Sequence, residues 1–232
     1  MKAFVQLSVV ELKLLAREPS ALFFMVAFPL MLLILTSGTD RIEILLPGYI
    51  SMILAIGGLT TMPAIVATYR ERKMLRRLAT TPATPINLLI AQVIAQLLMG
   101  LIGAAILIGV GVIGYGGEPP AHPFALALAF LLSALMLCSM GLIIAGLAPR
   151  ARIADLYGML VMFPMIFIGG AAMPKEVLPS GVRAIGDYLP LSQAITAMRE
   201  AWFGSPTLLP LLILTGITVV CTVIAALVFR WD

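Results

Sequence analysis

Long apolar runs separated by short polar stretches set the pattern of this 232-residue chain. Each run reaches or approaches the roughly 20 residues that a helix needs to cross the hydrocarbon core of a membrane. In lipid, a helix satisfies its backbone hydrogen bonds within its own segment, so the spans are expected to be helical and the fold all-α. The pattern predicts six transmembrane helices, over residues 20–37, 45–68, 86–114, 124–148, 155–173 and 207–229.

The stretch before the first span, residues 1–18, has a different pattern. Apolar residues occupy a broad arc of a helix, and a narrow opposite stripe holds Lys2, Gln6, Lys13 and Arg17. This separation is typical of an amphipathic helix that lies in the plane of the membrane surface. A proline follows at position 19 and ends or turns the helix, because the residue before a proline avoids the helical region.

A basic stretch over residues 70–78 separates spans two and three. Its basic residues fall on one side of a helix and its apolar residues on the other, with an acidic residue inside the apolar arc. The basic residues are Arg70, Arg72, Lys73, Arg76 and Arg77, the apolar ones Met74, Leu75 and Leu78, and the acidic one Glu71. We expect a short amphipathic helix here. It either anchors the loop to anionic lipid and fixes the topology, or it also contacts a partner.

The segment between spans five and six, residues 174–206, is unusually apolar for a loop. Two short amphipathic helices are predicted in it, over 176–187 and 191–203, and in the second Ile195, Met198 and Trp202 share one face. Irregular backbone at membrane depth has to be shielded by protein, so we expect a re-entrant outer helix pair. The alternative is an ordinary interfacial loop held by its aromatic residues.

Composition and charge place the whole chain, residues 1–232, in one integral membrane domain. It is 61% hydrophobic and 11% charged, whereas soluble domains carry about 25% charged residues. The basic residues therefore report on membrane orientation, and the net charge of +4 does not indicate a nucleic-acid partner. Eleven of the 15 Lys and Arg residues lie on the side of the six-span arrangement that holds both termini, which predicts that both termini are cytoplasmic.

The sequence offers no catalytic, cofactor-binding or metal-binding constellation. It has one histidine, His122, and two isolated cysteines, Cys138 and Cys221, so neither a zinc site nor a cysteine–histidine nucleophile pair can be built. The dipeptide Gly-Lys of a phosphate-binding loop does not occur. The apolar cores of the six predicted spans also lack ionisable residues, which ion-coupled transporters use at membrane depth. A transporter of this kind would take its energy from a partner.

Two stretches and the N-terminal amphipathic helix resemble a known family. The first stretch, RERKMLRRLATTPATPINLLIAQV over 70–93, is similar to an E-R-G-T-L-x-x-L-x-x-x-P pattern, with Glu71, Leu75, Leu78 and Pro82 in place and the usual Gly-Thr missing. The second, residues 162–204, carries a Phe-Pro pair, a Gly-Gly pair, P-x-x-x-L-P and a later Leu-Pro. Together they resemble the permease subunit of ABC-2 type ABC exporters, the group that includes the daunorubicin-resistance permeases.

The resemblance implies a mode of action. Members of this family work as dimers of six-span permeases, here expected to be a homodimer in the cell membrane. Two separate ABC-type ATPase subunits bind ATP and Mg, so the permease itself is not an enzyme. The residues that correspond to the family's ATPase-contacting coupling helix are 70–78. Spans two and five face the export path, and the candidates to line it are Met52, Ile56, Phe163, Met165 and Phe167; the alternative for these five is ordinary packing or contact with lipid.

The expected function is export of a hydrophobic or amphiphilic compound, such as a drug, an antibiotic or a lipid. The fourteen methionines suit an adaptable apolar lining. One alternative is an ABC-2 permease that exports a polysaccharide or a lipid-linked glycan, against which the 7% aromatic content argues mildly. Another is an ATP-independent membrane protein, such as a scramblase or an assembly factor.

Overall fold

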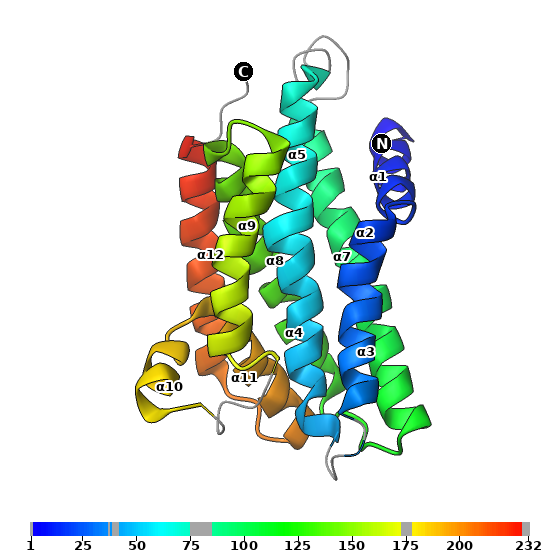
Figure 1. Cartoon of the computed structure of the whole chain (residues 1–232), viewed down its shortest axis with the longest axis vertical. Coiled ribbons are helices and arrows are strands. Elements are labelled where there is room, and N and C mark those ends of the chain that lie inside the picture. The colour runs from blue at the N-terminus through cyan, green and yellow to red at the C-terminus, as the bar shows by residue number, and fades with distance from the viewer. Residues whose placement is uncertain (1, 37, 39–41, 75–84, 173–177, 229–232) are drawn as a thin grey trace.

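The computed structural model describes residues 2–36, 38, 42–74, 85–172 and 178–228 as a bundle of helices (Figure 1). No strand occurs among these residues, so the prediction of an all-α fold is confirmed. The long helices run roughly along one direction, and α10 and α11 lie at the lower end of the bundle as drawn. The ends of α5, α8 and α12 and the starts of α1, α7 and α9 lie at the upper end.

The elements follow one another without long irregular stretches among the described residues. The first group is α1 (Lys2–Leu15), α2 (Pro19–Leu22), the π-helical turn η1 (Phe23–Ala27), α3 (Phe28–Leu35) and the 3₁₀ turn η2 (Ile42–Ile44). The central helix consists of α4 (Leu46–Ile56), the π-helical turn η3 (Gly57–Thr61) and α5 (Met62–Glu71). The remainder is α7 (Pro85–Gly109) with the π-helical turn η4 (Val110–Gly114), α8 (Pro123–Leu147), α9 (Ala151–Ile168), α10 (Ser180–Gly186), α11 (Pro190–Phe203) and α12 (Leu208–Val228).

Five helices of the described residues are long and apolar enough to cross a membrane: Ile42–Glu71, Ile86–Gly114, Pro123–Leu147, Ala151–Ile168 and Leu208–Val228. The helical run Pro19–Leu35, in the place of the first predicted span, follows Leu7–Leu15 after a bend of 73°, and a sixth span results if this bent pair counts as one. Pro19 lies at the bend, as the proline rule requires. The structure therefore gives five spans by length and composition where the sequence pattern predicts six.

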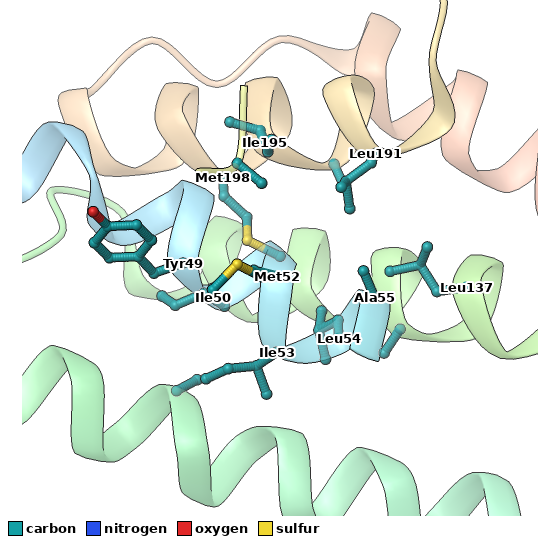
Figure 2. Close-up of a cluster of buried hydrophobic side chains, with 14 of the residues drawn as sticks. Tyr49, Ile50, Met52, Ile53, Leu54, Ala55, Leu137, Leu191, Ile195 and Met198 are labelled. Atoms are coloured by element: carbon teal, nitrogen blue, oxygen red, sulfur yellow. The ribbon is translucent and has the colours of Figure 1, made fainter. Parts of the chain in front are cut away.

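The central helix α4–η3–α5 forms the core of the bundle. Of the residues in its most apolar stretch 83% are buried, against 11% for α12, so α12 is peripheral and α4–α5 is enclosed. Figure 2 shows apolar side chains from α4, α8 and α11 meeting around this helix, with Met198 of α11 reaching toward Met52 of α4. The Ser51 hydroxyl donates to the carbonyl oxygen of Pro47, which satisfies it inside the same helix.

The turn η3 lets three helices approach at the level of their backbones. Pro63, at the start of α5, has no N–H to donate to the preceding turn, and the carbonyls of Gly58 and Leu59 lie in that turn. A Cβ on Gly141 of α8 would overlap the carbonyl oxygen of Gly58, and one on Gly158 of α9 would overlap that of Leu59. Because glycine has no side chain, Gly141 and Gly158 allow α8 and α9 to pack directly against η3.

Helix α11 closes the lower end of the bundle. Its predicted apolar face, formed by Ile195, Met198 and Trp202, is buried. The Trp202 indole N–H donates to the carbonyl oxygen of Glu118, 3.0 Å away, in the connection between η4 and α8. Of the predicted outer helix pair, residues 174–177 lie outside the described residues, and the helical part of the remainder is α10 and α11.

We predict that Gly141→Ala destabilises the protein more than any helical Gly→Ala change on an open face. The added methyl group would meet backbone of η3, which cannot rotate away, and overpacking of this kind commonly costs about 1–3 kcal/mol. The control is Gly216→Ala on α12, where a Cβ would have nothing within 4 Å; alanine is there expected to be neutral or stabilising. Thermal unfolding of both variants in the same detergent checks this, and equal midpoints would contradict the close contact.

Candidate functional site

The described part of the predicted coupling segment, residues 70–74, lies at the upper end of the central helix (Figure 1). Arg70 and Glu71 belong to the last turn of α5, so that helix continues three residues beyond the predicted end of span two at position 68. The chain then leaves the helix at Arg72 and Lys73 and is helical again at Met74. The other predicted coupling residues, Leu75, Arg76, Arg77 and Leu78, lie outside the described residues.

Arg70 binds the end of α8. Its guanidinium donates to the carbonyl oxygen of Gly146 at 3.4 Å and to that of Ala148. The last carbonyls of a helix have no partner within the helix and carry partial negative charge, so a cation is favoured at this point. Arg70 thus satisfies carbonyl groups of α8 from another helix.

Glu71 binds the start of α9. The backbone N–H of Ala151 donates to its Oε1, 2.6 Å away. The residue in the N-cap position of α9, Arg150, makes no side-chain cap hydrogen bond. A carboxylate is favoured at a helix N-terminus for the same reason that a cation is favoured at the C-terminus. Glu71 therefore supplies to α9 the cap that its own sequence lacks.

Tyr69 binds α1. Its hydroxyl lies 2.9 and 2.7 Å from the two carboxylate oxygens of Glu11 and donates to them. Glu11 is 4% exposed and lies on α1, outside the five helices that are long and apolar enough to cross a membrane. Burial raises the pKa of the Glu11 carboxyl, and the Tyr69 hydroxyl opposes this by stabilising the carboxylate.

Three consecutive side chains of α5 thus hold three other elements, and we call Tyr69, Arg70 and Glu71 the clasp. Small residues allow this proximity: Ala67 of α5, Ala148 after α8 and Ala154 of α9 are buried together. The sequence pattern predicts Arg70 and Glu71 in the coupling segment, and it indicates neither Tyr69 nor the intramolecular partners. The available signal for the α1 contact was Glu11, the one acidic residue between positions 1 and 17.

Lys73 stands where the E-R-G-T-L pattern has a glycine, and its backbone conformation is one that glycine favours. It has φ 55°, in the left-handed region that favours glycine. The residue after Glu71-Arg72 is glycine in the E-R-G-T-L pattern and Lys73 in this chain. The backbone therefore retains the conformation that a glycine would adopt most easily, and a lysine occupies it. This turn separates α5 from the helical residue Met74.

The five candidates for the export path divide into two groups. Met52, Ile56 and Met165 are buried within the single chain, and Figure 2 shows Met52 directed into the cluster between α4 and α11. Phe163 and Phe167 of α9 are about half exposed, and their rings are stacked with centroids 6.3 Å apart. Only these two therefore present side-chain surface outward from the bundle.

Two buried glutamines were not anticipated from the sequence. Gln92 and Gln96 lie one helical turn apart on α7, and none of their four side-chain amide atoms has a hydrogen-bond partner among the described residues. Gln96 borders a cavity of about 10 Å³ that is also lined by Gly57 and Cys138. Glutamine amides are neutral and so do not count among ionisable residues at membrane depth, but a pair of glutamines four positions apart in an apolar run is a signal that the sequence carries.

The contacts at the end of α5 are hydrogen bonds that hold helices together. Among the described residues no group of three or more His, Cys, Asp or Glu could hold a metal ion. The two cysteines are both free thiols. At the end of α5, Arg70 and Glu71 are hydrogen-bonded to backbone groups at the ends of α8 and α9, and Tyr69 to the carboxylate of Glu11.

Comparison with known proteins agrees with this description. A family model described as "ABC-2 type transporter" matches residues 2–203. The chain is also similar to Nodulation protein J of Rhizobium leguminosarum bv. viciae, with 33% identity over 75 residues, which is 32% of this chain and 29% of that protein. It is similar to the Probable multidrug ABC transporter permease YbhR of Escherichia coli (strain K12), with 25% identity over 184 residues, which is 74% of this chain and 49% of that protein. The matched part spans about half the length of these curated relatives or less.

We predict that Lys73→Gly preserves or strengthens the turn at the end of α5, whereas Lys73→Val weakens it. A left-handed residue other than glycine costs about 1–2 kcal/mol, and a β-branched side chain is the least tolerant of this conformation. The N–H groups of Arg72 and Lys73 donate to the carbonyl oxygens of Thr68 and Arg70, so hydrogen exchange of these two amides is the measurement. Faster exchange in Lys73→Gly than in Lys73→Val would contradict the assigned backbone conformation.

Proposed function

This chain belongs to the ABC-2 type transporter family, and from that membership we propose that it is the membrane-spanning permease subunit of an ATP-driven exporter. The observation that carries the proposal is the extent of the family match, residues 2–203, which includes every described helix except α12. In this assignment the chain supplies the path, and an ABC-type ATPase, which binds ATP and Mg, supplies the energy.

The polar residues inside the bundle support a separate energy source. In the described part of the chain, Glu11 of α1 is the only charged residue among those that are buried. The other buried polar side chains are the neutral ones of Ser51, Thr60, Gln92, Gln96, Ser133, Ser139 and Ser192. Transporters that use an ion gradient place ionisable groups at membrane depth to bind the coupling ion. An interior without buried charges in the described spanning helices is consistent with energy supplied by a separate ATPase at the upper end of the bundle.

Exposed residues at the end of α5 support the proposal that the ATPase binds there. Arg72, Lys73 and Met74 are exposed, and they follow directly after the clasp. An amphipathic helix that continues from here over residues 75–78 would offer its apolar face to a groove of the ATPase. The basic residues would hold the segment at the inner membrane face.

We assign the cargo to hydrophobic or amphiphilic compounds. The support is the outward surface of α9, where Leu160 is exposed together with the stacked pair Phe163 and Phe167. In the proposed homodimer, with two ATPase subunits, this surface of one protomer would face the partner across the export path. The similarity to a protein named as a probable multidrug permease favours the same class of cargo for this chain.

The proposed topology has six spans with both termini in the cytoplasm. It counts the bent pair of α1 and α2–α3 as an interfacial helix followed by the first span, which is favoured by the 73° bend at Pro19 and by the distribution of the basic residues. The upper end of the bundle then faces the cytoplasm, and α10 and α11 lie at the outer face.

The topology predicts opposite locations for two reporters. A reporter fused after Pro82 should be cytoplasmic, and one fused at Ser180 should be external, because the first position follows the strongest basic cluster of the chain. Alkaline phosphatase and green fluorescent protein fusions at both positions measure this. Location of both positions on the same side would contradict the six-span arrangement.

The coupling role predicts the effect of a double substitution. Leu75→Ala with Leu78→Ala should weaken ATPase binding and abolish ATP-driven transport, because truncation of apolar side chains at an interface centre costs about 1–2 kcal/mol each, or about tenfold in affinity for every 1.4 kcal/mol. Co-purification of the ATPase and its hydrolysis of ATP in the complex are the measurements.

The control for this double substitution is Arg72→Ala, which removes one of five basic residues and should have a smaller effect. Membrane insertion has to remain normal in every variant. Wild-type ATPase binding by the double variant would leave the segment with the simpler role of an anchor to lipid.

A further inference from the structure

The clasp occupies a special position in the chain, between the enclosed helix α5 and the segment proposed to contact the ATPase. We propose that Tyr69, Arg70 and Glu71 are positioning residues that pass movement of the coupling segment to α1, α8 and α9. This inference rests on the proposed function, and it assigns to the clasp a role inside the permease in place of direct contact with the ATPase.

The atoms that the clasp binds make it suited to this role. Arg70 and Glu71 bind backbone groups, the carbonyl oxygens of Gly146 and Ala148 and the N–H of Ala151. A backbone group at a helix end cannot rotate away as a side chain can, so α5 moves together with these helix ends or the hydrogen bonds break. The three bonds fall within residues 146–151, so a shift of α5 acts on the end of α8 and the start of α9 together.

The contact between Tyr69 and α1 is also costly to break. The Tyr69 hydroxyl bridges both oxygens of Glu11, and around it Tyr69 packs with Leu88 of α7 and Leu7 of α1. A buried carboxylate with this partner is costly to separate from it, because the carboxylate would remain in apolar surroundings. α1 is therefore expected to follow the end of α5.

A turn lies immediately after the clasp. Helix α5 ends at Glu71, and Lys73 adopts the left-handed conformation. Glu71 stands on the bundle side of this turn, and its Oε1 accepts the N–H of Ala151 at 2.6 Å. The turn therefore separates the clasp from the segment proposed to contact the ATPase.

A pair of substitutions at Glu71 separates this role from contact with the ATPase. The amide oxygen of Glu71→Gln can still accept the N–H of Ala151 but has no charge, and Glu71→Ala has neither. If Glu71 acts by holding α9, Gln restores function; if it acts on a basic group of the ATPase, Gln fails as Ala does.

The readout is an environment-sensitive bimane fluorophore on Tyr157→Cys, an exposed position of α9, with Cys138 and Cys221 replaced by alanine. The complex with the co-purified ATPase is compared before and after addition of Mg-ATP. We expect the ATP-dependent fluorescence change to be smaller in Glu71→Ala, because loss of one hydrogen bond of about 1 kcal/mol changes the equilibrium between the two positions of α9 about fivefold, and to be retained in Glu71→Gln. ATPase co-purification should stay at the wild-type level in both.

Tyr69→Phe serves as a second variant, for which the corresponding label is on α1 at Val10→Cys.

Three outcomes overturn the inference: an unchanged fluorescence response in Glu71→Ala, equal losses in the Gln and Ala variants, or a loss of ATPase binding in Glu71→Gln. Thermal unfolding of each complex shows that the variants are folded, and Arg150→Ala is the matched control at the same helix end, because its side chain makes no cap bond. Failure of the proposed function is distinguishable from these outcomes, since in that case the unmodified chain would neither bind an ABC-type ATPase nor respond to ATP.

Discussion

The backbone contact at η3 is the constraint on which the rest of the bundle depends. In a membrane every backbone polar group has to find a partner within the protein, and a π-helical turn followed by Pro63 makes this difficult for the central helix. The carbonyls of Gly58 and Leu59 lie against Gly141 of α8 and Gly158 of α9. Direct coverage by neighbouring backbones shields this turn from lipid, and it fixes where two other helices pass the central one.

A second fixed point follows further along the same helix. The backbone contact is made by Gly58 and Leu59, and the clasp contacts α8 and α9 through Arg70 and Glu71, so at 1.5 Å per residue the two contacts are about 18 Å apart. At both points the central helix holds the same two neighbours, α8 and α9. Two contacts along one axis set a direction as well as a position, so α5, α8 and α9 form one unit. The clasp then adds α1, which otherwise packs mainly on α7.

The sequence allowed prediction of features that depend on a repeating pattern. The apolar runs, the amphipathic face of Ile195, Met198 and Trp202, and the bend before Pro19 each arise from periodicity or from a proline, and these are local properties. Helix α5 continues to Glu71, three residues past position 68, where the sequence pattern ends the second span. The partners of Arg70 and Glu71 are helix ends that are distant in the chain, at positions 146–151, and the partner of Tyr69 is Glu11.

The remainder depended on tertiary contacts that no pattern encodes. Burial of Met52, Ile56 and Met165 within one protomer could not be separated from a position on the export path, since an apolar side chain suits both environments. Lys73 shows the opposite case. The missing glycine weakened the resemblance at the sequence level, yet the backbone at this position has φ 55°, a conformation that glycine adopts easily.

The two faces of α9 connect these contacts to the proposed export path. Gly158 faces the backbone of η3, and at 100° per residue Phe167 lies about 180° around the helix from it. The inner face is thus held by a glycine contact and by Glu71 at the helix start, while the outer face carries the stacked rings of Phe163 and Phe167. A helix held so closely on one side cannot turn its aromatic face independently. Any change at the end of α5 that reaches Glu71 would therefore act on the two rings along α9, whose last turns contain Pro164, a residue with no backbone N–H to donate within the helix.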